Sequence, residues 1–165
     1  MKNTKKITKL TKKDIETIIL KQFLELSNIV FDLRKLNTKS ENREPIDLEY
    51  DNQGYQITTG DGEYFGRIMS VTEKYDISNV QGRIVSRLLN FNSIVESFLN
   101  RILEKKKNRS DVRVILLISI LTVDPFRDDE REEEYKKFAT KNQSLLKCWE
   151  EVYCIFQDKQ LIKLF

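Results

Sequence analysis

The acidic run from Asp128 to Glu134 is the clearest group of side chains that could do chemistry, because carboxylate oxygens bind hard cations such as Mg²⁺ and Ca²⁺. Only Arg131 interrupts it. Consecutive carboxylates on a helix point in different directions and cannot converge on one ion, whereas acids are favoured in the first turn of a helix. The run therefore predicts a solvated helix start in preference to a metal site.

Residues for other kinds of catalysis are missing. The chain has no histidine, which excludes Ser-His-Asp and Cys-His arrangements. Its two cysteines, Cys148 and Cys154, cannot form a zinc site alone and are poorly spaced to pair across a helix. Gly60-Asp61-Gly62 lacks the glycine spacing and the following helix of a phosphate-binding loop. We therefore expect a protein that binds rather than catalyses, with no metal and no cofactor.

The composition is that of one ordinary domain. The chain has 165 residues, of which 39% are hydrophobic and 33% charged, and its formal net charge is +3. Residues 1–10 form a basic, flexible tail in this interpretation, and residues 11–165 form a single domain. The lysines of the tail have no arginines or aromatic residues among them, so we expect no direct binding to nucleic acid. No signal peptide and no apolar run of about 20 residues is visible, which favours a nuclear or cytoplasmic location and no membrane association.

Apolar residues at three- and four-residue steps predict three long helices. The first spans 11–36, with Thr11 and Asp14 at its start. The second spans about 79–102. The third begins in the acidic run and continues to Phe156.

Between the first two predicted helices, apolar residues recur at every second position. The runs 46–50, 55–59 and 63–66 alternate apolar with polar residues and are separated by turns through Asp51-Asn52-Gln53-Gly54 and Gly60-Asp61-Gly62. This pattern predicts a small β-hairpin or three-stranded meander over about 46–66.

The most apolar segment, Val112 to Val123, fits either a buried strand or a helix that is apolar on most sides. We favour the helix, because no comparable strand is evident for it to pair with. The fold class that follows is mostly α: a layered helical bundle with one small β-hairpin or meander.

Four segments resemble the ligand-binding domain of nuclear receptors, in particular the vitamin D and ecdysone receptor branch. They are KLTKKDIETIILK (9–21), NQGYQITTGDGEYFGR (52–67), LLISILTVDPF (116–126) and QLIKLF (160–165). In the family these would be the signature motif, the hairpin, the buried eighth helix and the start of the tenth helix. The family's first helices and its final activation helix have no counterpart here, so the resemblance is partial and divergent.

The resemblance implies an apolar small-molecule ligand, sterol-like or another lipid, between the hairpin and the first helix. The residues it assigns to this ligand are Phe23, Ser27, Val30, Arg34, Ile57, Thr59, Tyr64 and Phe65. It also implies a protein partner beside Lys21 and a dimer surface that contains Leu161, Leu164 and Phe165. The function it implies is a receptor module in transcription regulation. The alternative is a small interaction protein, an accessory or inhibitor protein of a virus or mobile element, with no small-molecule ligand.

Overall fold

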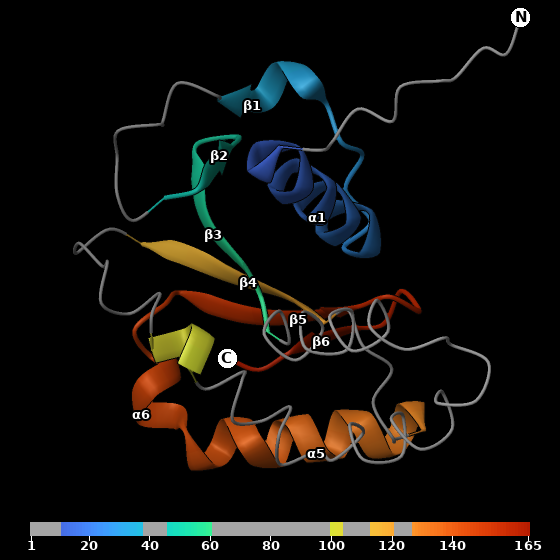
Figure 1. The fold of residues 1–165 in the computed structure, drawn as a ribbon, viewed down its shortest axis with the longest axis vertical. Helices are drawn as coiled ribbons and strands as arrows, with labels where there is room; N and C mark the ends of the chain where they lie inside the picture. The colour runs from blue at the N-terminus through green and yellow to red at the C-terminus, as the bar shows by residue number, and fades with distance from the viewer. Residues whose placement is uncertain (1–10, 38–45, 61–99, 104–112, 121–126) are drawn as a thin grey trace, which may run out of the picture.

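A six-stranded mixed β-sheet forms the centre of the molecule in the computed structural model (Figure 1). The structure describes residues 11–37, 46–60, 100–103, 113–120 and 127–165. The strands lie in chain order and are β1 (Leu36–Asn37), β2 (Leu48–Tyr50), β3 (Gln53–Thr59), β4 (Val114–Ile120), β5 (Glu151–Phe156) and β6 (Leu161–Lys163). β3, β4 and β5 are parallel, and the remaining neighbours are antiparallel.

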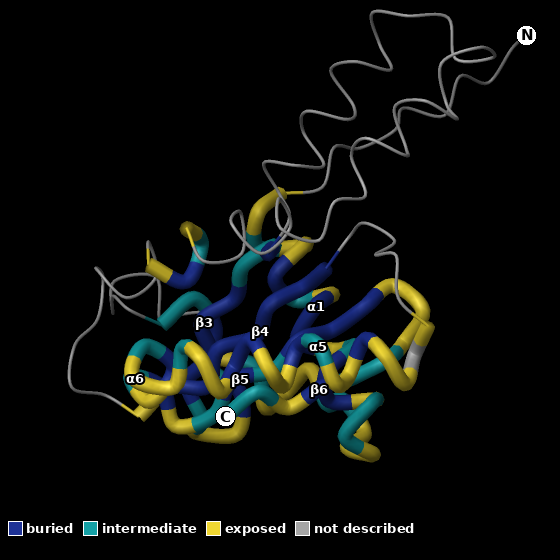
Figure 2. The backbone as a smooth tube through the Cα atoms, turned by 90° about the horizontal axis from the view of Figure 1, so that it is seen from below, coloured by how far each residue is buried: buried dark blue, intermediate teal, exposed yellow. Residues whose placement is uncertain are grey.

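Helices lie on both faces of the sheet. α1 (Lys12–Leu26) packs on one face, and α5 (Asp128–Lys141) with the short α6 (Gln143–Leu146) lies on the other. A 3₁₀ turn, η1 (Leu33–Lys35), leads into β1. Two hydrophobic clusters result, one per face, and the central strand β4 between them is buried along its whole length (Figure 2). In the described part of the chain, no helix is long and apolar enough to cross a membrane.

The prediction of a mostly α, layered helical bundle is therefore wrong. The sheet contributes residues to both hydrophobic clusters, so it is the framework on which the helices pack. The nuclear receptor resemblance implied a helical domain, and this implication fails with it. The described part of the segment that resembled the buried eighth helix, residues 116–120, belongs to strand β4, and the segment that resembled the tenth helix contains strand β6.

β4 is a strand because it has the partners that the sequence seemed to lack. It pairs with β3 from Gly54↔Val114 to Thr59↔Ser119, and with β5 from Ile115↔Glu151 to Ile120↔Phe156. All seven of its residues are buried, since helices cover both faces. A strand buried on both faces shows no alternation of apolar and polar residues, so the spacing of its apolar residues cannot distinguish it from a buried helix.

The predicted helices are shorter than their apolar patterns. α1 begins at the Thr11 capping box, as predicted, but ends at Leu26 instead of continuing to 36. The third helix ends at Lys141, and its predicted continuation becomes α6 and β5. Residues 100–103 are helical, and the rest of the predicted second helix lies outside the described residues.

The predicted hairpin exists as β2 and β3, but its turn is tighter. Asp51 and Asn52 have φ values of 51° and 66° and connect Tyr50 directly to Gln53, which are paired residues. Two left-handed residues between paired ends are the geometry of a type I′ hairpin. The third strand of the meander is β1, and the predicted strand at 63–66 lies outside the described residues.

Candidate functional site: an aliphatic loop at the β1 edge

Residues 28–35, between α1 and β1, expose aliphatic side chains to solvent. We call this segment the aliphatic loop. Val30 is 88% exposed, Leu33 69% and Ile29 47%. Scattered single apolar residues are normal on protein surfaces, but three exposed aliphatic residues within five positions of one loop make this loop a candidate interaction site.

The loop leaves α1 through a defined helix termination. Asn28 has a left-handed φ of 61°, its N–H donates to the Glu25 carbonyl (3.1 Å), and the Ile29 N–H donates to the Leu24 carbonyl (2.8 Å). These two bonds form a Schellman motif, which satisfies carbonyls that the end of a helix leaves without partners. Asparagine tolerates the left-handed conformation better than most residues. The helix therefore ends here, and the apolar residues that follow lie outside it.

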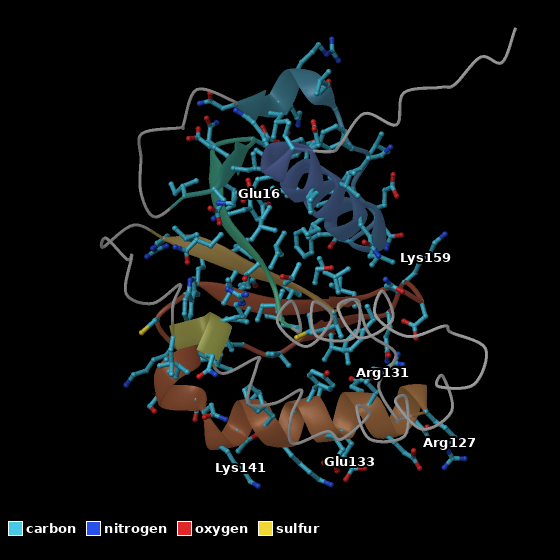
Figure 3. The ribbon with its side chains drawn as sticks, viewed as in Figure 1. Glu16, Arg127, Arg131, Glu133, Lys141 and Lys159 are labelled. Carbon is cyan, nitrogen blue, oxygen red and sulfur yellow. The ribbon has the colours of Figure 1, made fainter. Side chains whose placement is uncertain are left out.

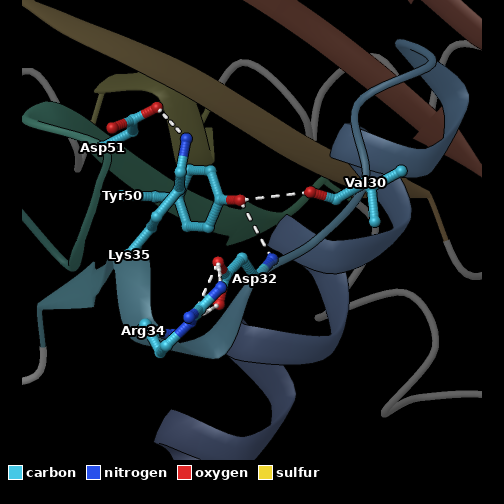
Figure 4. A network of polar contacts seen from close by, with 6 residues as sticks. All are labelled: Val30, Asp32, Arg34, Lys35, Tyr50 and Asp51. Carbon is cyan, nitrogen blue, oxygen red and sulfur yellow. Dashed lines mark hydrogen bonds and ion pairs between the residues drawn. The ribbon is translucent and has the colours of Figure 1, made fainter.

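Tyr50, on β2, holds the middle of the aliphatic loop (Figure 4). Its hydroxyl donates to the Val30 carbonyl (3.4 Å) and accepts from the Asp32 N–H (3.1 Å). Its ring stacks on Phe31, with 5.6 Å between centroids and 18° between planes. Since Tyr50 is only 3% exposed, the loop backbone is fixed to the sheet while Val30 points outward.

The charges around the loop are paired within the molecule. The Arg34 guanidinium donates to both carboxylate oxygens of Asp32, and the Lys35 ammonium lies 2.7 Å from Asp51 (Figure 4). The hydrogen bonds from Arg34 lower the pKa of Asp32, and the hydrogen bond to Asp51 raises the pKa of Lys35. The two acids and two bases cancel, so the rim that these four residues form beside the aliphatic side chains has no net charge.

In the described residues, the neighbouring edge strand β1 consists of Leu36 and Asn37, and the N–H of Leu36 is already bonded to the carbonyl of Leu33. This N–H is therefore not available to an added strand. The exposed aliphatic side chains are the groups that the described part of this edge offers to a partner.

Among the residues that the receptor resemblance assigned to a ligand, those that the structure describes lie in different surroundings. Phe23, on α1, and Ile57, on β3, are buried in the same hydrophobic cluster between α1 and the sheet. Phe23 there contacts the rings of Tyr55 and Tyr153. Ser27 is the C-cap of α1. Val30 and Arg34 are exposed on the aliphatic loop, and a ligand role for any of these residues stays a prediction.

The remaining predicted residues are also dispersed. Thr59 is half-buried at the end of β3, while Tyr64 and Phe65 lie outside the described residues. Lys21 is exposed and lies 3.7 Å from Glu25. Leu161 packs beside the α1-face cluster, and Leu164 and Phe165 pack beside the α5-face cluster. The predicted dimer residues thus belong to β6 and the chain that follows it.

Two acidic side chains lie beside Lys12 at the start of α1, and one of them, Glu16, is labelled in Figure 3. The Lys12 ammonium lies 3.3 Å from Glu16 and 3.9 Å from Asp47, and Asp47 accepts the N–H of Ile57 at 2.8 Å. Leu48 and Tyr55 are the last paired residues of β2 and β3, and the Asp47 side chain adds a hydrogen bond beyond them. No group of three or more potential metal ligands occurs among the residues that the structure describes.

A comparison with protein-family models, with curated proteins and with solved structures finds no match to this chain. The candidate site therefore rests on its own geometry. Sequence reasoning missed the loop because Ile29, Val30 and Leu33 continue the three- and four-residue spacing of α1. Asn28, a residue that favours helix ends, was the signal that could have located it.

Proposed function

We propose that this protein is a protein-binding module and that the aliphatic loop is its contact surface. The observation that carries the proposal is the 88% exposure of Val30 on a backbone fixed by Tyr50. Exposing an aliphatic side chain gains nothing for the free protein, whereas burying it against a partner gains about 1.5–3 kcal/mol. A loop already fixed in shape loses little conformational entropy when it binds, so more of this energy contributes to affinity.

The charge pattern favours a protein partner over a membrane or nucleic acid. An apolar loop that inserts into an anionic membrane normally carries unpaired cations, and nucleic-acid contacts require them too. Here Arg34 and Lys35 are paired with Asp32 and Asp51. A neutral rim around an apolar centre resembles the anatomy of protein–protein interfaces.

The proposal is tested by placing a photo-crosslinking amino acid at position 30 and, as a control, at the exposed position 141 on α5. In cells that naturally make the protein, position 30 is expected to capture a specific protein and position 141 is not. Leu33→Asp should abolish the crosslink, because it places a charge in the apolar contact while the free fold tolerates it at an exposed site. Lys147→Asp, a charge change at an exposed position outside the aliphatic loop, should leave the crosslink unchanged.

Tyr50→Phe gives a graded test. It removes both hydrogen bonds to the loop but keeps the ring that stacks on Phe31, so it should cost about 1 kcal/mol of stability and weaken capture at position 30. Equal crosslinking from positions 30 and 141, or capture that survives Leu33→Asp, would contradict the proposal.

A further inference from the structure

β6 forms the opposite edge of the sheet, and no described residue bonds to the backbone groups on its outer side. In the antiparallel β5–β6 pair, the Phe156 N–H donates to the Gln160 carbonyl and the Leu164 N–H donates to the Val152 carbonyl. Residues that bond to the neighbour alternate along an antiparallel strand. Gln160, Ile162 and Leu164 therefore bond to β5, and the N–H and C=O groups of Leu161 and Lys163 point away from the sheet.

The lysine on this strand does not protect the edge. Edge strands often carry a lysine whose charge prevents pairing with another chain. The Lys163 ammonium instead lies back across β5, where it pairs with Glu151 and lies 5.7 Å from the centre of the Tyr153 ring. Its hydrogen bond to Glu151 lowers the pKa of that carboxyl. With this charge held over the sheet, the outer side of β6 presents, among the residues that the structure describes, its backbone groups and the half-buried Leu161.

We propose that β6 pairs antiparallel with β6 of a second copy of this chain, around a two-fold axis through Ile162. The register places Leu161 opposite Lys163 of the second copy, and Lys163 opposite Leu161 of the second copy. Both pairs consist of residues whose backbone groups point outward, so each pair can exchange two hydrogen bonds. The proposal is independent of the aliphatic loop, which lies at the other edge of the sheet.

A second copy fits this edge because the strand is complementary to itself. With Ile162 on the axis, every outward N–H of one copy faces an outward C=O of the other. The two Ile162 side chains also become neighbours on the α5 face, beside the half-buried Leu164 and Phe165. A two-fold contact closes on itself, so it ends at a dimer and leaves no open β6 edge.

The test compares the sedimentation of the wild-type chain, Lys163→Ala and Lys163→Pro over a range of concentrations. Both variants lose the same ion pair with Glu151, but only proline also loses the outward N–H. Proline is tolerated on an edge strand where its nitrogen faces solvent, so the monomer keeps every bond to β5. Wild type and Lys163→Ala are expected to dimerise, and Lys163→Pro to be at least tenfold weaker in association.

Amide hydrogen exchange provides a readout that does not depend on a variant folding. At high concentration the amides of Leu161 and Lys163 should be protected, and dilution should release them while Ile162 and Leu164 stay protected. A wild-type chain that remains monomeric, or a dimer whose Leu161 and Lys163 amides exchange freely, would overturn the proposal. Pairing of β6 with a foreign strand, seen as protection of both amides in a monomer bound to another protein, would overturn the second copy as the occupant.

Discussion

Gly54 allows the chain preceding β2 to lie close against β3. A Cβ at this position would lie 2.8 Å from Cδ1 and 3.1 Å from Cγ1 of Ile46. Its φ is not positive, so space and not backbone conformation requires the glycine. The sequence pattern had placed Gly54 in the turn, because glycine is common there, whereas Asp51 and Asn52 make the turn by adopting left-handed φ values.

Gly54→Ala is expected to lower the free energy of unfolding by about 1–3 kcal/mol, because the added methyl group must displace Ile46. Ile46→Val removes the nearest atom, so Gly54→Ala should cost less in the Ile46→Val background. Urea denaturation of the two single variants and the double variant measures this coupling. Strictly additive effects would show that the two side chains do not compete for space.

At the scale of elements, Arg131 attaches α5 to the β5–β6 hairpin (Figure 3). This arginine is 5% exposed, and its guanidinium donates to Asp158 at 2.6 Å and Gln160 at 2.7 Å. It also lies 4.7 Å from the centre of the Phe156 ring. One side chain from the first turns of the helix thus contacts the end of β5 and the turn that follows it.

Arg131→Lys should lower the free energy of unfolding by about 1–3 kcal/mol. This is less than the loss expected from breaking a fully buried ion pair, because Asp158 is half-exposed. A lysine cannot reproduce the planar contacts to two acceptors and a ring. Arg127→Lys is the matched control, since Arg127 is exposed and, among the described residues, its side chain pairs with Glu130 of the same helix. This variant should unfold at the wild-type urea concentration. Equal effects of the two substitutions would contradict a specific role for Arg131.

Elements with a local signal could be predicted from the sequence, and elements defined by distant partners could not. Thr11 and Asp14 predict the start of α1, and the type I′ turn joins strands that are adjacent in sequence. β4 becomes a strand only because β3 and β5 flank it. β5 was not predicted as a strand, because its segment also fits the spacing of a helix: Trp149, Val152, Tyr153 and Phe156. The candidate site was missed for the related reason that its apolar residues continue the pattern of α1.

At the scale of the whole molecule, Cys154 reports on global unfolding. Its thiol is completely buried in the α5-face cluster, and burial raises its pKa well above the ordinary value. The chain's other cysteine, Cys148, is only half-buried. Thiolates and not thiols react with alkylating reagents, so the two cysteines should differ strongly.

Native protein treated with a thiol reagent should therefore be modified quickly at Cys148 and, at Cys154, only as fast as the protein unfolds. Mass spectrometry of peptides after timed labelling measures both rates, and Cys148→Ser isolates the slow one. Urea should accelerate modification of Cys154 in parallel with the loss of Trp149 fluorescence. Modification of both cysteines at one rate in the native protein would contradict complete burial of Cys154.

The central position of β4 has a consequence for how the chain can be synthesised. Val114–Ile120 is a run of seven residues without charge or proline, and β5, which covers one of its sides, is made later by the ribosome. Until then this run has the composition of segments that associate into cross-β aggregates. The exposed Arg113 before it and Pro125 after it in the sequence are the kinds of residue that limit such association. We therefore expect slow or interrupted translation, which leaves β4 without β5, to favour aggregation through the strand that stabilises the finished fold.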